Sequence, residues 1–326
     1  MTKYRIVIVG AGRIAGVHAL SVGRNRRLEL AGFVDPTGGG SLPAEYGVPC
    51  FADLSTAIEV ARPDALVIAS PTSTHVDYIL QACDRDLPAL CEKPVAFDRE
   101  SIVEVIARVA SAGIPVVLGF HRRFDPYRCE MRGRVAAGEV GAMEHILQLS
   151  RDPRLGEAAA VSHQGSIISD MVVHDLDELI WFVGGLPDRA QAWLGRNVEP
   201  SLAGPADTVN ILLSWNGGPV AHISATRRAV HAFEQRLEVF GSEGRLICGD
   251  PQTSPVLVDT ARDSRLPRRH EHFWDRYRLA YQAEVDHLAD ILATGTPPRC
   301  TLTDGLRAHD LVTMVRNAAG DVRPAA

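Results

Sequence analysis

The sequence predicts an α/β protein with two domains: an N-terminal doubly wound Rossmann domain and a C-terminal α+β domain with a largely antiparallel open sheet. Its 326 residues exceed the roughly 250 at which a single hydrophobic core stops growing. The first third alternates apolar runs with helix-period segments, and the remainder carries successive strands joined by turns. We place the boundary after residue 118, which gives domains of residues 1–118 and 119–326.

Short apolar runs separated by amphipathic segments define the first domain. Each crossover helix covers one side of the sheet, so strands that are apolar throughout indicate a parallel sheet with helices on both faces. The expected strands are 6–9, 28–34, 65–69, 89–91 and 115–118.

The second domain is expected to be a sheet with helices on one face. Turn residues such as Asn216, Gly217 and Gly218 separate neighbouring strands, as in β-hairpins. The expected strands are 206–215, 219–226, 235–240 and 245–248, and the expected helices are 170–183, 272–293 and 304–318. A sheet with one uncovered face needs a partner, so we expect a homodimer or homotetramer formed through this sheet.

Composition and charge disfavour several classes of protein. Apolar residues make up 46% of the chain and charged residues 23%, the balance of an ordinary globular protein. The net charge of -6 disfavours a nucleic-acid partner, and no apolar run reaches the roughly 18 residues of a membrane span. The six cysteines lack CxxC pairs and metal-ligand spacing, and no secretion signal opens the chain. We therefore expect a cytoplasmic protein with reduced thiols and with no metal, membrane or nucleic-acid partner.

A glycine-rich turn follows the first expected strand and opens a helix, which is the context of a dinucleotide-binding fingerprint. Gly10 permits the tight turn, Gly12 lets the backbone approach a pyrophosphate, and Ala15 keeps the helix close to the strand. The N–H groups at the start of the helix, where Arg13 and Ile14 stand, favour the diphosphate. The alternative is a glycine-rich turn without a ligand.

Asp35 ends the second expected strand, about 20 residues beyond the glycines, where a carboxylate binds the hydroxyls of the adenosine ribose. This carboxylate would repel a 2′-phosphate, and Pro36 and Thr37 follow it instead of an arginine. We therefore predict NAD as the cofactor. The alternative is that Asp35 caps a loop.

Several further segments carry a resemblance to a known family. Beside the glycine turn, they are Ser70-Pro71-Thr72-Ser73-Thr74-His75, Glu92-Lys93-Pro94, Gly119-Phe120-His121-Arg122-Arg123-Phe124-Asp125, Asp170-Met171-Val172-Val173-His174-Asp175-Leu176-Asp177 and Asp304-Gly305-Leu306-Arg307-Ala308. In this order, and across nearly the whole chain, they resemble the glucose-fructose oxidoreductase, inositol dehydrogenase and MocA family, particularly its inositol 2-dehydrogenase branch.

The resemblance implies that Lys93 is catalytic. Lys3 and Lys93 are the only lysines, and Lys93 stands at the carboxyl end of a strand, where doubly wound folds place ligands. By resemblance, Lys93 polarises the reacting hydroxyl or carbonyl, and Glu92 lies near the cofactor. The loop that passes the nicotinamide ribose in the family corresponds to Ser70, Thr72 and His75. A lone lysine is usually a solvated surface residue, but in a chain that otherwise uses arginine, a lysine at the expected nicotinamide end of the crevice favours a functional role.

Asp170 and His174 are spaced i, i+4, so on a helix they share one face. Hydride leaves an alcohol carbon as the hydroxyl proton is removed, and a histidine with a pKa of about 6.5 accepts such a proton near neutral pH. The resemblance implies that His174 is this base, and that Asp170 fixes its tautomer or binds a substrate hydroxyl. From spacing alone, a surface histidine in an acidic turn is the better interpretation.

Arg122 and Asp152 complete the expected substrate contacts. Arg122 and Arg123 stand beside the predicted interdomain crevice, where a guanidinium could hold substrate or form an interdomain salt bridge. The family branch often has a His-Arg-Asn-type segment where this chain has Ser150-Arg151-Asp152-Pro153, and residues 163–166 and 231–234 also depart from its pattern. Such differences bear on the identity of the substrate more than on the reaction type.

Together these residues predict an oxidoreductase that transfers a hydride between NAD and a secondary alcohol of a cyclic polyol or sugar, most similar to an inositol 2-dehydrogenase. Two alternatives stay open: an NAD-dependent glycosidase of the same superfamily, and a non-catalytic sugar-sensing regulator on this fold. Alcohol-dependent formation of NADH distinguishes the dehydrogenase from both.

Overall fold

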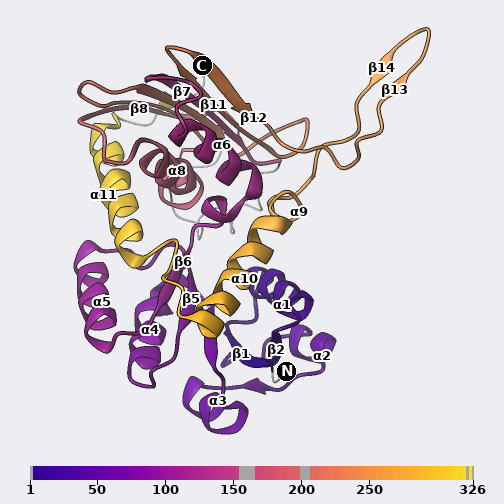
Figure 1. The fold of residues 1–326 in the computed structure, drawn as a ribbon, viewed down its shortest axis with the longest axis vertical. Helices are drawn as coiled ribbons and strands as arrows, with labels where there is room; N and C mark the ends of the chain where they lie inside the picture. The colour runs from indigo at the N-terminus through magenta and orange to yellow at the C-terminus, as the bar shows by residue number, and fades with distance from the viewer. Residues whose placement is uncertain (1–2, 154–165, 199–205, 321–322, 325–326) are drawn as a thin grey trace. The chain divides into compact units, whose positions relative to one another are not determined.

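The computed structural model of the protein describes residues 3–153, 166–198, 206–320 and 323–324. The chain forms two compact units (Figure 1): Met1–Asp125 with Arg278–His309, and Pro126–Tyr277 with Asp310–Ala326. These units differ from the predicted division at residue 118, because the first unit extends to Asp125 and also includes residues 278–309 from later in the chain. Helix α11 (Leu302–Ala318) begins in the first unit and ends in the second.

Sheet A of the first unit is parallel, as predicted, and has six strands in the order β3-β2-β1-β4-β5-β6. The strands are β1 (Tyr4–Val9), β2 (Leu28–Val34), β3 (Cys50–Phe51), β4 (Ala65–Ile68), β5 (Ala89–Glu92) and β6 (Val116–Gly119). The two-residue edge strand β3 is the only one of these outside the predicted segments. The strand order reverses between β1 and β4, and doubly wound sheets bind ligands at the carboxyl ends of strands at such a reversal.

Aspartate side chains mark the start of two helices in the first unit. Asp53 accepts a hydrogen bond from Thr56 N at 2.8 Å, and Asp98 accepts one from Ser101 N at 2.8 Å. The helices are α1 (Arg13–Arg24), α2 (Leu42–Tyr46), α3 (Leu54–Ala61), α4 (His75–Cys83), α5 (Arg99–Ala112) and α10 (Arg278–Thr294), with 3₁₀ turns η1 (Thr72–Thr74) and η2 (His121–Phe124). Helix α10 packs against α1, β5 and η2. In the described ranges, no helix combines the length and the apolar character needed to cross a membrane.

Sheet B of the second unit has seven strands in the order β12-β11-β7-β10-β9-β8-β15. Most neighbours are antiparallel, as predicted, but β10 runs parallel to β7 and β15 runs parallel to β8. The strands are β7 (Met143–Arg151), β8 (Arg189–Arg196), β9 (Thr208–Ser214), β10 (Val220–Thr226), β11 (Glu234–Gly241), β12 (Gly244–Cys248) and β15 (Arg323–Pro324), with a separate hairpin of β13 (Val258–Asp259) and β14 (Ser264–Arg265). Strands β7 and β8 were not predicted, because polar residues interrupt their apolar pattern.

Side chains alternate between the two faces of sheet B, as the pleat requires. One face is buried, and helix α8 lies over it, since Gln148 of β7 donates to Glu178 of that helix at 2.9 Å. The helices are α6 (Pro126–Ala136), α8 (Val173–Val183) and α9 (Phe273–Arg276), and a π-helical turn (Ile168–Val172) precedes α8. The opposite face is open and carries exposed apolar side chains: Leu147, Trp193, Leu212, Val220, Phe240 and Ile247.

Candidate active site

The predicted site residues divide between the two compact units. The first unit holds Gly10, Gly12, Arg13, Ile14, Asp35, Ser70, Thr72, His75, Glu92, Lys93 and Arg122, and the second unit holds Asp152, Asp170 and His174. In the first unit, these residues lie at or just beyond the carboxyl ends of sheet A strands. That edge is where the reversal of strand order predicts ligand binding.

The glycine turn between β1 and α1 fits a diphosphate. Gly10 has a φ of +93°, and a Cβ there would lie 2.7 Å from the Ala69 carbonyl oxygen, so only glycine permits this approach of two loops. A Cβ at Gly12 would meet no protein atom within 4 Å, so this glycine leaves a cradle that a side chain would fill. Helix α1 starts at Arg13 with no acidic residue in its first turn and no side chain capping it. Its backbone N–H groups therefore suit an anion.

The Asp35 carboxylate joins the end of β2 to the glycine turn. Its Oδ2 accepts a hydrogen bond from Ala11 N at 3.2 Å, and its Oδ1 accepts from the Thr37 hydroxyl at 2.6 Å and from Thr37 N at 2.9 Å. The hydrogen bond from the Thr37 hydroxyl, with those from backbone N–H groups, holds the pKa of Asp35 below its ordinary value despite partial burial. Asp35 is therefore an ionised acceptor beside the diphosphate cradle, as NAD binding requires.

His75 is surrounded by backbone rather than by open space. The side chain is buried, with Nε2 2.9 Å from the Ser70 carbonyl oxygen and Nδ1 2.8 Å from the Pro94 carbonyl oxygen. The ring thus ties the loop after β4 to the loop after β5. The predicted direct contact of His75 with the cofactor does not fit these surroundings, whereas Ser70 and Thr72 of the same loop are only half-buried.

Lys93 directly follows β5 and is half-buried. The preceding Glu92 is buried, and its Oε1 lies 2.8 Å from Nε2 of His18, a fully buried histidine of α1. The carboxylate therefore anchors the end of β5 to α1. This anchoring fixes the backbone from which Lys93 extends.

Arg122 and Arg123 are the two middle residues of η2, and both side chains are buried. Arg123 Nη1 lies 3.1 Å from Asp304 Oδ1, and both residues belong to the first unit. Arg123 thus forms an ion pair within the first unit. The contact of Arg122 with substrate stays a prediction.

In the second unit, two parallel strands bring polar residues to one edge of sheet B. Asp152 follows β7, and its backbone N donates to the carbonyl oxygen of Thr226, the last residue of β10, at 3.1 Å. The next residue, Arg227, is buried and places Nη1 and Nη2 3.3 and 3.2 Å from Asp170 Oδ2. Asp152, Arg227 and Asp170 therefore lie at the same edge.

Arg227 was not predicted as a site residue. Its signal in the sequence is an arginine directly after an expected strand. In an antiparallel sheet, successive strands end at opposite edges, so only the parallel pairing of β7 and β10 brings Arg227 beside Asp152.

Asp170 lies in the π-helical turn, and His174 lies in the first turn of α8. The predicted pairing of Asp170 with His174 assumed a regular α-helix and stays a prediction. One partner of Asp170 in the structure is Arg227. Single π-helical turns are frequent at functional sites. His174 is half-buried.

The acidic turn around His174 is not solvated surface. Asp175, Asp177 and Glu178 are each 1% exposed. Ser150 Oγ of β7 donates to Asp175 Oδ1 at 2.5 Å, and Arg128 Nε of α6 lies 3.2 Å from Glu178 Oε1. These buried contacts contradict the interpretation of His174 as a residue of an exposed acidic turn, and they hold α8 in a fixed position on the sheet.

Comparison with known proteins decides the family. The sequence model of an oxidoreductase family with an NAD-binding Rossmann fold matches residues 4–120, and that of the GFO/IDH/MocA C-terminal domain matches residues 129–247. The chain belongs to the GFO/IDH/MocA oxidoreductase family. An uncharacterized oxidoreductase of Bacillus subtilis is 32% identical over 94% of this chain and 92% of its own length. An inositol 2-dehydrogenase of Rhizobium meliloti is 31% identical over 97% of each chain.

Solved structures of similar proteins agree with this family. A myo-inositol dehydrogenase from Corynebacterium glutamicum is 33% identical with a TM-score of 0.90, covering 97% of this chain and 96% of its own. A scyllo-inositol dehydrogenase from Lactobacillus casei, solved with NAD(H) and scyllo-inositol, is 26% identical with a TM-score of 0.91, covering 98% and 97%. These findings confirm the predicted family, fold class and NAD-dependent oxidoreductase activity. The departures at residues 163–165 lie outside the described residues.

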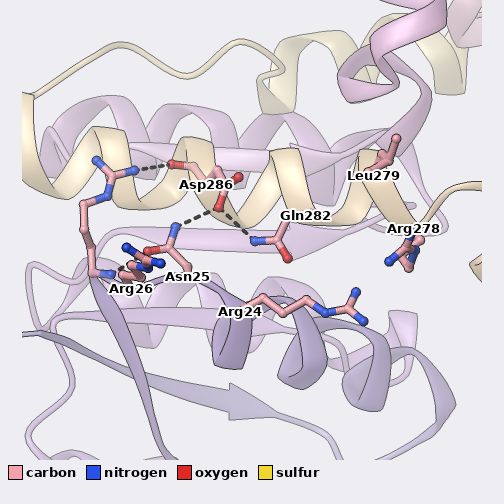
Figure 2. A pocket seen from close by; sticks show the side chains of 8 residues that line it. Arg24, Asn25, Arg26, Arg278, Leu279, Gln282 and Asp286 are labelled. Carbon is pink, nitrogen blue, oxygen red and sulfur yellow. Dashed lines mark hydrogen bonds between the residues drawn. The ribbon is translucent and has the colours of Figure 1, made fainter.

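A separate hollow of this GFO/IDH/MocA protein lies at the other end of α1 (Figure 2). Its volume is about 570 Å³, and it is lined by Arg24, Asn25, Arg26, Arg27, Arg278, Leu279, Gln282 and Asp286. Asp286 Oδ1 accepts hydrogen bonds from Asn25 at 2.7 Å and from Gln282 at 2.9 Å. Helix α1 starts at the carboxyl edge of sheet A and ends at the amino edge, so this hollow is not part of the cofactor crevice.

Replacing Asp35 by serine is expected to raise KM for NAD by about 10- to 100-fold, because each hydrogen bond to a charged group contributes roughly 1.5–3 kcal/mol. The same change removes the charge that repels a 2′-phosphate, so the preference for NAD over NADP should fall. Steady-state kinetics with both cofactors measure this ratio. The matched control is Glu59→Gln, which removes an exposed carboxylate of α3 and should leave the ratio unchanged. An unchanged ratio in the Asp35 variant would contradict the assignment.

Proposed function

We propose that this family member oxidises a secondary ring hydroxyl of a cyclic polyol with NAD, as an inositol 2-dehydrogenase-like enzyme. The observation that carries the proposal is the edge of sheet B where Asp152, Arg227 and Asp170 gather beside the helix of His174. Carboxylates and a guanidinium suit the uncharged, closely spaced hydroxyls of a polyol, because they accept and donate hydrogen bonds in fixed directions. The relatives and structures named as inositol dehydrogenases support this substrate class.

We assign separate tasks to His174, Lys93 and Asp170. His174 takes the proton of the reacting hydroxyl, and Lys93 stabilises negative charge on the same oxygen. NAD, when bound, accepts the hydride from the ring carbon. Asp170 is oriented by Arg227, at 3.2 Å, so we assign it to bind a neighbouring hydroxyl instead of fixing the tautomer of His174.

A substrate screen tests the proposal. Inositol stereoisomers, aldoses and amino-polyols are each incubated with NAD, and the absorbance of NADH is followed. We expect NADH formation with at least one inositol. Release of sugar from glycosides without accumulation of NADH would establish a glycosidase instead. NADH binding without turnover of any of these compounds would establish a sugar-sensing regulator.

We also propose that the open face of sheet B joins copies of this chain into a homodimer or homotetramer. The exposed apolar residues on that face come from six neighbouring strands, and a contiguous apolar patch on a sheet marks an interaction surface. Neighbouring polar side chains on the same face, such as Asn210 and His222, resemble the mixed composition of protein interfaces.

Replacing Leu147 by arginine, on strand β7, is expected to convert the assembly into monomers. In a dimer or a tetramer, each copy of the chain would bury an unpaired arginine charge at the interface. Size-exclusion chromatography with light scattering measures the mass. Val60→Arg is the control, because Val60 is an exposed apolar residue of α3 in the other unit. A monomeric wild-type protein at micromolar concentration would contradict the proposal.

The cytoplasm is the proposed location of the enzyme. All six cysteines lie in the described ranges, and none of them forms a disulfide there. Six cysteines without a disulfide suit a reducing compartment, where disulfides are rare.

A further inference from the structure

Glu92 and the residues behind it form a buried group of ionisable side chains in the first unit. Glu92 is the last residue of β5 and pairs with His18 of α1 at 2.8 Å. Gly119, its partner on β6, packs closely on the end of β5, because a Cβ there would lie 3.2 Å from the Cys91 carbonyl oxygen and 3.4 Å from the Glu92 carboxyl carbon. The ends of β5 and β6 are thus tightly packed beside this carboxylate.

Glu284 of α10 belongs to the same group. Its side chain is fully buried, and neither carboxyl oxygen has a hydrogen-bond partner among the described residues. Tyr281, one helical turn earlier, contacts His18 edge-on at 5.6 Å between ring centroids and stacks on His121 of η2 at 5.0 Å. The turn of α10 that carries Glu284 therefore lies against the elements that hold Glu92.

An ionised carboxylate in such a place is costly, because burial without a partner penalises the charged form. Burial, with a further contribution from the charge of Glu92, raises the pKa of Glu284 well above its ordinary value. Full burial without a hydrogen-bond partner among the described residues therefore favours the protonated form of Glu284. In that form the carboxyl group is an O–H donor.

We propose that Glu284 is a positioning residue that acts in its protonated form: it holds the Glu92 carboxylate against His18 and thereby fixes the end of β5 that carries Lys93. This inference depends on the proposed function only where it assigns a catalytic role to Lys93. When Glu284 loses its proton, the carboxylates of Glu284 and Glu92 are both charged in the same low-dielectric interior and repel, which displaces the end of β5. A displacement of about 1 Å at a catalytic group lowers the rate by up to about 100-fold.

The elements packed against α10 carry other buried ionisable side chains. They are His18 of α1, Cys91 and Glu92 of β5, and His121, Arg122 and Arg123 of η2, with Tyr281 and His287 on α10 itself. Arg123 is paired with Asp304, and His287 Nε2 accepts from Arg299 N at 3.0 Å. Burial is the first cause of the raised pKa of Glu284, and the charge of Glu92 is the second.

The test compares Glu284→Leu, Glu284→Gln and the wild-type enzyme. Leucine removes the donor, so kcat should fall by about 10- to 100-fold. Glutamine imitates the protonated acid, so it should restore most of that loss at neutral pH. The wild type should lose activity as the pH rises through the raised pKa of Glu284, and Glu284→Gln should lack this loss. The control is Val285→Ala, which leaves a cavity at a buried position of the same helix. It should lower the melting temperature without changing the pH profile of activity.

Infrared spectroscopy supplies a readout that does not need turnover. The wild type should keep the C=O stretching band of a protonated carboxylic acid at neutral pH, and Glu284→Gln should lack it. The same pH profile in Glu284→Gln and wild type, or the absence of this band from the wild type, would overturn the proposal. If no polyol reduces NAD, the pH dependence of NADH affinity replaces kcat, so failure of the proposed function leaves this test intact.

Discussion

Replacing His174 by alanine is expected to lower kcat by about 100- to 10,000-fold, the usual contribution of a positioned general base. His174 stands at the start of α8, whose buried side holds Asp175 and Glu178 in contact with Ser150 and Gln148 of β7. The helix should therefore keep its place when the imidazole is removed. The affinity for NADH should stay unchanged, because the predicted cofactor site lies in the other unit.

Lys93→Met should lower kcat by a comparable factor, because it removes the cation that stabilises charge on the reacting oxygen. Lys93→Arg should restore little, since a planar guanidinium does not replace a compact ammonium group.

Both effects are measured as initial rates of NADH formation with saturating NAD and the best polyol. Lys3→Met removes the other lysine of the chain, and His309→Ala removes a histidine of α11. Both controls should keep the wild-type rate. Wild-type rates in His174→Ala and Lys93→Met would refute the assignment of the active site.

Replacing Arg128 by methionine is expected to destabilise the second unit by about 3–5 kcal/mol, because it leaves the buried charge of Glu178 without its cation. The side chains of Arg128 and Glu178 are each 1% exposed and lie 3.2 Å apart. The other guanidinium nitrogens of Arg128 donate to the carbonyl oxygens of Gln235 at 3.1 Å and Cys248 at 3.3 Å. One arginine thus joins α6, α8 and the neighbouring strands β11 and β12.

Thermal denaturation checks this prediction, with an expected fall of the midpoint by about 6 to 20 °C. The matched control is Arg134→Met, which breaks an exposed ion pair of α6 with Glu139 and should cost under about 1 kcal/mol. The double change of Arg128→Met with Glu178→Leu should be more stable than Arg128→Met alone, because no charge is then left uncompensated. Equal stability of Arg128→Met and Arg134→Met would contradict the buried network.

Much of the first unit could be predicted because its features are encoded by residues that are close together in the sequence. Gly10 and Gly12 have a conformational reason to follow a strand, and Asp35 ends the next strand. Five of the six strands of sheet A overlap the predicted apolar segments. These features depend on neighbours in the sequence, so periodicity and spacing detect them.

The parts that were missed depend on residues far apart in the chain. Arg227 lies beside Asp152 only because β10 pairs with β7 in parallel, and strand β7 was not predicted because polar residues interrupt its apolar pattern. His75 gains its carbonyl partners from two separate loops. In the sequence, Glu284 cannot be told from an exposed acidic residue of an amphipathic helix, because its burial depends on the packing of α10 on β5. Tertiary contacts decide the chemistry of all three residues.

Helix α10 belongs to the first compact unit although it is synthesised after residues 126–277. Ribosomes add roughly 5–20 amino acids per second, so about 10–30 s separate the emergence of residue 125 from that of α10. During that interval the nascent chain displays the apolar surface of α1 that α10 later covers. A chaperone near the exit tunnel could bind this exposed apolar surface during synthesis. A fragment expressed as residues 1–125 alone, without α10, should aggregate.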